Sequence, residues 1–329
     1  MDKIFLCDNE RDVKRVYDSR VRERLDISPE IFSGKSINAA NREKLGGVKY
    51  AFSTWGMPKL TEEQIREYLP SLECVFYAAG TVGYFAEPFL KSGVRVFSAA
   101  WANGIPVAEY TVSQILLASK GYFQAEKLYR TDLSLSRERA WNVQGNYYSK
   151  VGLIGLGVIG SMVAEKLKAF DIEVLAYDPF AGEEKASSLG VTLVTLPELF
   201  ERCNVISNHL ANKQELNDIL NYELFRLMKS NATFINTGRG AQINEEDLAR
   251  ALREEEARTA VLDVQKQENT PSEGPLWNCP NAIMTPHIAG SMGYEVTRMA
   301  DFIIDQYELF LEGKECLSEV TLEKLGTMA

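Results

Sequence analysis

The chain has 329 residues, of which 45% are apolar and 25% charged, and this length and composition predict an ordinary globular protein of about two domains. Its net charge of -10 argues against nucleic acid or an anionic membrane surface as the main partner, although it leaves room for a local site that binds a small anion. No stretch approaches the ~18 apolar residues of a membrane span, and the N-terminus lacks the apolar run of a signal peptide. Five scattered cysteines without a C-x-x-C spacing predict free thiols, no metal site and a reducing, cytoplasmic location.

Short apolar segments of strand-like composition alternate with longer amphipathic segments along the chain. The predicted strands are 48–54, 74–80, 94–100, 150–157, 173–179, 204–210, 232–238, 259–264 and 282–287. Helical patterns lie between many of them, at 61–69, 161–170, 196–202 and 244–255, and two long helices are predicted at 107–130 and 293–311. This alternation predicts parallel sheets built from right-handed crossover units.

The two long helical patterns are the natural points at which the chain passes from one domain to another. Residues 1–104 and 290–329 are predicted to form one domain, and residues 105–289 a second domain inserted between them. Two crossings would leave a cleft and a hinge. The alternative interpretation is one continuous large sheet, since domains usually have ~100–200 residues.

The segment "KVGLIGLGVIGSMVAEKL" carries the sharpest local signal. Gly155, Gly157 and Gly160 form G-x-G-x-x-G directly after a predicted strand and directly before a helical pattern, with Val158 and Ile159 between the last two glycines. The first glycine allows a tight turn, the second lets the backbone approach a pyrophosphate, and the third lets helix and strand pack closely. This context on both sides predicts a dinucleotide site.

An acidic residue follows at the distance that a dinucleotide site requires. Asp178 ends the next predicted strand, 18 residues after Gly160. Its carboxylate would accept hydrogen bonds from a ribose diol and repel a 2′-phosphate, which favours NAD over NADP. The alternative is a glycine-rich tight turn followed by an incidental aspartate.

Three further strands lead into loops that carry a charged or titratable residue. Arg239 stands between two glycines, Glu268 follows the strand 259–264, and His287, one of only two histidines, ends the segment 282–287. Ligands of open parallel sheets lie beyond the carboxyl ends of the strands, so these side chains are expected to converge. A ketone that accepts a hydride needs a proton donor and a cation for its carboxylate, tasks that suit histidine and arginine, and a glutamate would keep the imidazolium charged. The alternative is that each is an ordinary solvated loop residue.

Together these motifs resemble the D-isomer-specific 2-hydroxyacid dehydrogenase family. The resemblance covers most of the chain and rests on "GLIGLGVIG" with "YDP", on "INTGRG", on "LDV" with Glu268 five residues after Asp263, and on "TPHIAG". It implies an α/β protein in which a Rossmann dinucleotide-binding domain is inserted into a flavodoxin-like substrate domain. It also implies an NAD-dependent oxidoreductase acting on a small 2-keto or 2-hydroxy acid, and a homodimer that pairs through the cofactor domain.

The resemblance assigns roles to individual residues. Arg239 would bind the substrate carboxylate, His287 would be the acid/base and Glu268 its partner. Asp263 would lie near the nicotinamide, and His209 would lie beside the cofactor without acting as the acid/base. The segments "YAAGTVGYF" and "SAAWANGIPVAEYT" would bring Ala79, Gly80 and Asn103 to the substrate. The predicted cofactor site comprises Gly155, Gly157, Val158, Ile159, Gly160, Asp178, His209, Thr237 and Asp263.

Some positions depart from the family pattern. "HLANK" lacks the proline common after "HL", the residues around Glu268 differ, and Ala78 stands where the phosphoglycerate branch commonly has arginine. The last departure argues against a phosphoglycerate substrate, and the particular keto acid stays open. The alternative functions are a cofactor-sensing protein like the corepressors of this fold and a dehydrogenase of the formate or phosphite type. The pair of Glu268 and His287 favours the hydroxyacid branch over the formate branch.

Overall fold

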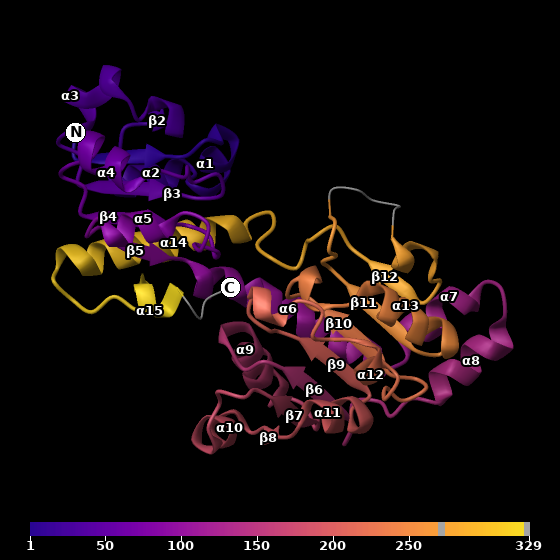
Figure 1. Cartoon of the computed structure of the whole chain (residues 1–329). Helices are drawn as coiled ribbons and strands as arrows, with labels where there is room; N and C mark the ends of the chain where they lie inside the picture. The colour runs from indigo at the N-terminus through magenta and orange to yellow at the C-terminus, as the bar shows by residue number, and fades with distance from the viewer. Residues whose placement is uncertain (269–273, 326–329) are drawn as a thin grey trace. The chain divides into compact units, whose positions relative to one another are not determined.

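The computed structural model describes residues 1–268 and 274–325 (Figure 1). The chain divides into two compact units, Met1–Gly104 with Ser291–Ala329, and Ile105–Gly290. Each unit has a sheet of its own, so the interpretation as one continuous sheet is wrong. No helix among the described residues is long and apolar enough to cross a membrane.

The first unit is built on a six-stranded sheet in the order β13-β5-β4-β3-β1-β2. All neighbouring strands are parallel except β13, which runs antiparallel to β5. The first five strands therefore follow the 2-1-3-4-5 order of a flavodoxin-like sheet, as predicted. The strands are β1 (Lys3–Leu6), β2 (Ile31–Phe32), β3 (Tyr50–Ser53), β4 (Cys74–Tyr77), β5 (Arg95–Ser98) and β13 (Glu319–Val320).

Helices from both ends of the chain pack on this sheet. A row of in-register rings forms the centre of the core: Phe52, Phe76 and Phe97 stack at centroid distances of 5.3 and 4.8 Å. Tyr307 of α14 meets two of these rings edge-on, so the C-terminal segment completes the core of the first unit. The helices are α1 (Glu10–Val16), α2 (Ser19–Leu25), α3 (Arg42–Leu45), α4 (Glu62–Tyr68), α5 (Ala86–Lys91), α14 (Glu295–Leu311) and α15 (Leu322–Leu325).

The second unit holds a seven-stranded, wholly parallel sheet in the order β12-β11-β10-β9-β6-β7-β8. Counted within the unit, this is 3-2-1-4-5-6-7, the Rossmann order extended by one strand, which confirms the predicted fold class. Most strand residues are buried because helices cover both faces, so the strands have continuous apolar sequences. The strands are β6 (Lys150–Ile154), β7 (Glu173–Tyr177), β8 (Thr192–Leu193), β9 (Val205–Asn208), β10 (Thr233–Asn236), β11 (Thr259–Leu262) and β12 (Ala282–Met284).

The helices of the second unit differ from prediction most clearly at the long helix expected at 107–130. The helix expected at 161–170 also starts earlier, as α9, and α8, α10 and α12 were not predicted. The expected helix 107–130 is two helices: α6 (Ala100–Ser119) starts earlier and contains Pro106, and Gly121, at φ +68°, separates it from α7 (Tyr122–Tyr129). Proline usually marks a helix start because it lacks a donor N–H, and this start was therefore placed too late. The remaining helices are α8 (Leu133–Trp141), α9 (Val158–Leu167), α10 (Glu183–Leu189), α11 (Leu196–Arg202), α12 (Tyr222–Phe225) and α13 (Glu245–Glu254).

Two helix ends are fixed by hydrogen bonds. Asn244 caps α13 by accepting from the amide N–H of Asp247 at 3.2 Å. Gly313 adopts φ +66° after α14, and the amides of Gly313 and Lys314 bond back to Phe310 and Leu309, which closes the helix as a Schellman motif. Four strands of two to four residues, β1, β2, β8 and β13, were not predicted because such short segments carry little periodic signal.

Candidate functional site

The predicted cofactor and catalytic residues of the second unit lie at one edge of its sheet. Because the strands are parallel, their carboxyl ends share that edge, which is where open α/β sheets bind ligands. The residues that follow strands β6, β7, β9, β10, β11 and β12 by one to three positions are Gly155, Asp178, His209, Thr237, Asp263 and His287.

The glycine loop between β6 and α9 depends on close backbone approach. Gly155 has φ +93°, and a Cβ there would lie 2.9 Å from the carbonyl oxygen of His209. A Cβ on Gly160 would lie 2.0 Å from the carbonyl oxygen of Gly155, so α9 could not pack against the loop with any other residue. These two glycines bring strand and helix together as the sequence predicted.

The outer side of the same loop is open. A Cβ on Gly157 would meet no atom within 4 Å, and this residue caps α9 without a side-chain hydrogen bond. Val158 and Ile159 start the helix, so their amide N–H groups have no acceptor within it. Uncapped amides at a helix N-terminus in front of open space fit the pyrophosphate of a dinucleotide.

Asp178 lies beside this loop at the end of β7. Its half-buried carboxylate accepts hydrogen bonds from the amide N–H groups of Leu156 (2.7 Å), Phe180 (2.8 Å) and Ala181 (3.1 Å). Two carboxylate oxygens offer about four acceptor positions, so one remains for a ribose hydroxyl. The residues present therefore fit NAD, and the fixed negative charge opposes a 2′-phosphate.

The structure brings His287 and Glu268 together although 19 positions separate them. The Nδ1 atom of His287 lies 3.0 Å from Oε2 of Glu268, and both side chains are partly exposed. With Nδ1 facing the carboxylate, Nε2 is the ring nitrogen left to meet a substrate. A histidine held through Nδ1 in this way can exchange a proton through Nε2.

Asp263 holds the loop that carries His287. Its buried carboxylate accepts from the hydroxyl of Thr285 (2.6 Å) and from the amides of Ile288 and Ala289 (both 2.8 Å). The backbone amide of His287 donates to the carbonyl of Asp263, and His287 itself has φ +53°, a left-handed conformation that side chains rarely adopt. Such a conformation persists only where the surroundings impose it, and Asp263 supplies those bonds.

Arg239 interacts electrostatically with Glu268, the partner of His287. Burial lowers the pKa of the Arg239 guanidinium, and the negative charge of Glu268 acts in the opposite direction. A guanidinium remains charged at neutral pH in any protein environment, so a half-buried cation faces this edge. Gly240 allows the approach, since a Cβ there would lie 2.0 Å from the backbone of Gln265, at the start of the loop that leads to Glu268.

The second histidine differs from the first. Burial lowers the pKa of His209 to about 4, so its ring is neutral near pH 7 and cannot supply a proton as imidazolium. Its Nε2 lies 3.0 Å from the Ser207 hydroxyl. The Thr237 hydroxyl lies 3.1 Å from that of Thr111 in α6, which joins the end of β10 to the helix.

In the first unit, Ala79, Gly80 and Asn103 lie close to one another. The Ser98 hydroxyl donates to the carbonyls of Ala79 (3.1 Å) and Gly80 (2.8 Å), and a Cβ on Gly80 would lie 3.4 Å from Nδ2 of Asn103. The amide of Ser291 donates to Oδ1 of Asn103 at 3.3 Å. Among the described residues, the amides of Ala79 and Gly80 meet no acceptor, and paired free amides suit a carboxylate.

A buried amide network at the ends of β9 and β10 was not predicted. Asn208 and Asn236 are register partners in the sheet, and Nδ2 of Asn208 donates to Oδ1 of Asn236 (3.0 Å) and to Oε1 of Gln242 (2.6 Å). All three side chains are fully buried. The available signal was an asparagine within each of two predicted buried strands, at the end of "VISN" and of "TFIN".

This network fixes the loops that carry predicted site residues. The Nε2 atom of Gln242 donates to the carbonyls of Leu210 (2.9 Å) and Ala211 (2.7 Å), directly after His209. The side chain of Asn236 donates to the carbonyl of Arg239 at 3.1 Å. Buried amides of this kind stabilise a structure only when their bonds are satisfied, so they hold both loops in one arrangement.

Comparison with known proteins gives consistent matches. The model of the D-isomer specific 2-hydroxyacid dehydrogenase NAD-binding domain matches residues 112–289. A D-3-phosphoglycerate dehydrogenase of Methanocaldococcus jannaschii is 33% identical over 249 residues, which are 74% of this chain and 47% of the relative. A Staphylococcus haemolyticus protein named as a 2-hydroxyacid dehydrogenase is 34% identical over 232 residues, 69% of this chain and 71% of that protein. The NAD-complexed D-isomer specific 2-hydroxyacid dehydrogenase of Lactobacillus delbrueckii ssp. bulgaricus has a TM-score of 0.77 and 20% identity, over 97% of this chain and 100% of its own.

These matches confirm the predicted family, fold class and cofactor. The matched domain is an NAD-binding domain, and the relatives are named as dehydrogenases, so the prediction of an NAD-dependent oxidoreductase is confirmed at that level. The chain spans about half the length of the archaeal relative, and its own substrate remains to be assigned.

The amide network makes a prediction for stability. Gln242→Leu keeps the volume but removes a buried acceptor from Asn208 and a buried donor from the carbonyls of Leu210 and Ala211, so we expect the free energy of unfolding to fall by about 2–5 kcal/mol. Urea denaturation followed by circular dichroism measures the change. Gln214→Leu, at an exposed position, is the control and should shift the midpoint little. Equal midpoints for Gln242→Leu and the unaltered protein would show that the network contributes nothing.

Proposed function

Because the chain belongs to the D-isomer specific 2-hydroxyacid dehydrogenase family, we propose that it is an NAD-dependent D-2-hydroxyacid dehydrogenase that acts on a small 2-keto acid. The observation that carries this proposal is the pair of His287 and Glu268, at the sheet edge that also holds the glycine loop. A proton donor beside a dinucleotide site is what reduction of a ketone requires.

Each residue of the second unit has a task in this reaction. NADH supplies the hydride when it is bound. The imidazolium of His287 gives the proton on Nε2 to the keto oxygen, so that the ketone gains one hydride and one proton and becomes an alcohol. The carboxylate of Glu268 orients the ring through Nδ1. In the oxidation of a hydroxy acid, the neutral ring accepts the proton instead.

The cation of Arg239 is proposed to bind the substrate carboxylate. Its planar fork donates two parallel hydrogen bonds to a carboxylate, and partial burial strengthens such a contact. The free amides of Ala79 and Gly80 and the side chain of Asn103 keep their predicted role in substrate binding on the first unit. Asp263 acts through the loop that it holds, as a positioning residue for His287.

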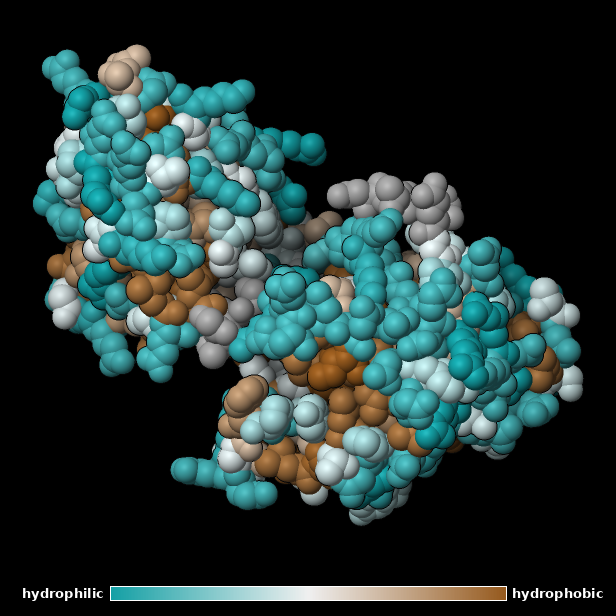
Figure 2. Space-filling view, viewed as in Figure 1, coloured by the Kyte–Doolittle hydropathy of each residue, from teal (hydrophilic) through white to brown (hydrophobic). Residues whose placement is uncertain are grey.

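We also propose a cytoplasmic homodimer that pairs through the second unit. Figure 2 shows some hydrophobic surface, coloured brown, where α7 and α8 lie. Large apolar and aromatic side chains are exposed on α6, α7 and α8: Leu117, Tyr122, Tyr129, Leu133 and Trp141. Trp141 is 85% exposed, which is costly for an isolated chain. Two-fold association is the commonest way to cover such a surface. All five cysteines carry free thiols, in keeping with a reducing compartment.

The proposed reaction is tested with a panel of 2-keto acids and NADH, by following the absorbance of NADH. We expect at least one acid to be reduced, and His287→Asn to lower turnover by about 10²–10⁴-fold while NADH binding, measured by fluorescence, is kept. Arg239→Lys should raise the Michaelis constant, because an ammonium cannot form the paired bonds. NADH binding without turnover of any acid would favour the cofactor-sensing alternative.

The pairing of Glu268 with His287 predicts a loss of turnover when the carboxylate is removed. Glu268→Gln keeps the size of the side chain but removes the charged group that orients the ring through Nδ1, so kcat for reduction should fall while NADH binding is kept. Glu295→Gln, outside this pair, should leave kcat unchanged. An unchanged kcat in Glu268→Gln would break the proposed pairing.

The charge of Asp178 predicts preference for NADH over NADPH. A carboxylate where a 2′-phosphate must sit should cost roughly 1–3 kcal/mol, so the ratio of kcat/KM values should favour NADH by about fivefold or more. Asp178→Asn removes the charge but keeps an acceptor for the loop amides. It should lower the ratio of kcat/KM with NADH to kcat/KM with NADPH. The exposed Asp171 provides the control variant, Asp171→Asn. Equal efficiency with both cofactors in the unaltered enzyme would refute this role.

The proposed dimer is tested by light scattering at micromolar concentration. We expect twice the mass of one chain, and we expect Trp141→Glu to shift the mass toward the monomer because it places a charge in an apolar contact. Leu317→Glu, also exposed but in the first unit, should leave the mass unchanged. A monomeric unaltered protein would contradict the proposal.

A further inference from the structure

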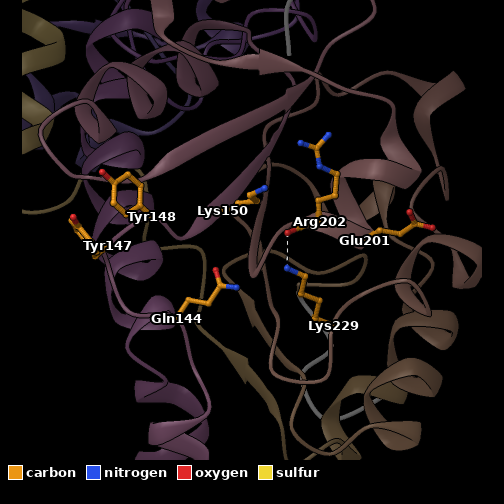
Figure 3. Close-up of a pocket in the computed structure, with 7 residues that line it drawn as sticks. All are labelled: Gln144, Tyr147, Tyr148, Lys150, Glu201, Arg202 and Lys229. Carbon is orange, nitrogen blue, oxygen red and sulfur yellow. Dashed lines mark hydrogen bonds between the residues drawn. The ribbon is translucent and has the colours of Figure 1, made fainter.

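A hollow of about 540 Å³ lies at the other edge of the sheet in the second unit (Figure 3). Lys150 begins β6, and the amides of Asn204 and Thr233 join the starts of β6, β9 and β10 there. The glycine loop follows the opposite end of β6, about 13 Å away at ~3.3 Å per residue. The hollow is therefore separate from the cofactor site. Its lining residues are Gln144, Tyr147, Tyr148, Lys150, Glu201, Arg202 and Lys229.

The lining is positively charged although the whole chain carries a net charge of -10. It contains Lys150, Arg202 and Lys229 against one carboxylate, that of Glu201, which points away from the two lysines in Figure 3. No ion pair of Arg202 or Lys229 is found among the described residues, and Lys150 has only a long contact, 3.5 Å, with Glu173. Cations gathered in a concave surface concentrate anions there.

The two lysines repel each other in the absence of an anion. The ammonium of Lys229 donates to the carbonyl of Arg202 (2.7 Å) and to Oδ1 of Asn204 (3.1 Å), which fixes its position at the end of α11. Burial lowers its pKa, and the positive charge of Lys150 lowers it further. An anion between the two would offset both effects.

Aromatic rings form the other side of the hollow. Tyr147 and Tyr148 are 65% and 72% exposed, and their ring centroids lie 4.3 Å apart in an edge-to-face arrangement. Tyr148 has φ +52°, a left-handed backbone that its amide bond to the carbonyl of Asp171 helps to hold. The strained backbone of Tyr148 thus accompanies a conformation that keeps both rings at the surface. Gln144 extends toward the lysines between the rings and the charges (Figure 3).

We propose that this hollow binds a nucleoside monophosphate, with the phosphate on Lys150 and Lys229 and the base on the tyrosine rings. Phosphate is a dianion suited to paired cations, and a flat base stacks on an aromatic ring. The Gln144 amide can both donate to and accept from the polar edge of a base. The volume lies within the ~300–1,000 Å³ of small-molecule sites. This site is independent of the proposed reaction.

Calorimetric titration with uridine 5′-monophosphate tests the proposal. The protein is first saturated with NAD, so that the cofactor site is filled and cannot take the nucleotide. We expect binding of the monophosphate, with uridine and inorganic phosphate each binding much more weakly because each meets only half of the site. NADH bound to the protein should not be displaced, which fluorescence detects.

Two variants locate the binding. Lys150→Gln should weaken the monophosphate roughly three- to tenfold, and Tyr148→Ser at least about fivefold. Lys166→Gln is the matched control, because the Lys166 side chain is 38% exposed and paired with Glu109, as Lys150 is 36% exposed and paired with Glu173. It should bind the monophosphate as the unaltered protein does.

Three results would overturn the proposal. The first is no heat from the monophosphate at millimolar concentration, and the second is equal affinity in Lys150→Gln. The third is that inorganic phosphate binds as tightly as the monophosphate, since the rings would then have no role. If Lys150→Gln instead changed the mass in light scattering while the nucleotide did not bind, the hollow would be a contact between protein chains.

Discussion

The candidate site rests on the buried hydrogen bonds among Asn208, Asn236 and Gln242. Parallel strands bring their carboxyl ends to one edge, but the loops that leave that edge need bonds of their own. The three amides provide them, because one network reaches the loop after His209 and the loop of Arg239. A buried amide without a partner is costly, so any other arrangement of these loops is disfavoured.

A second set of bonds fixes the histidine loop by the same principle. The buried carboxylate of Asp263 accepts hydrogen bonds from Thr285, Ile288 and Ala289. These bonds hold His287 in a left-handed backbone conformation next to Glu268. The contrast between the histidines follows from burial, which keeps His209 neutral, whereas His287 is partly exposed beside a carboxylate.

The two edges of the Rossmann sheet differ in how they present charge. The carboxyl edge combines uncapped amides with Arg239 and the carboxylates of Asp178, Asp263 and Glu268. The amino edge carries Lys150 at the start of β6 and Lys229 in the loop before β10, with tyrosines from the chain that leads into β6. Helix and strand ends lie at both edges, so one sheet can offer two separate polar surfaces.

The sequence by itself determined the features that depend on local pattern. The spacing of glycines after a predicted strand identified the dinucleotide loop, and the alternation of strands and helices identified the fold class. Both signals come from residues that are close together in the sequence. The pairing of Glu268 with His287 was expected from the family resemblance, and the tertiary structure added its geometry, a distance of 3.0 Å. The pairing of Asn208 with Gln242 was not predicted and needed the tertiary structure, since 34 positions separate the two residues. The start of α6 was also decided by the fold, which accommodates Pro106 inside a helix. Contacts between distant residues arise from the order of strands in a sheet, and that order is set by packing rather than by any local stretch of chain.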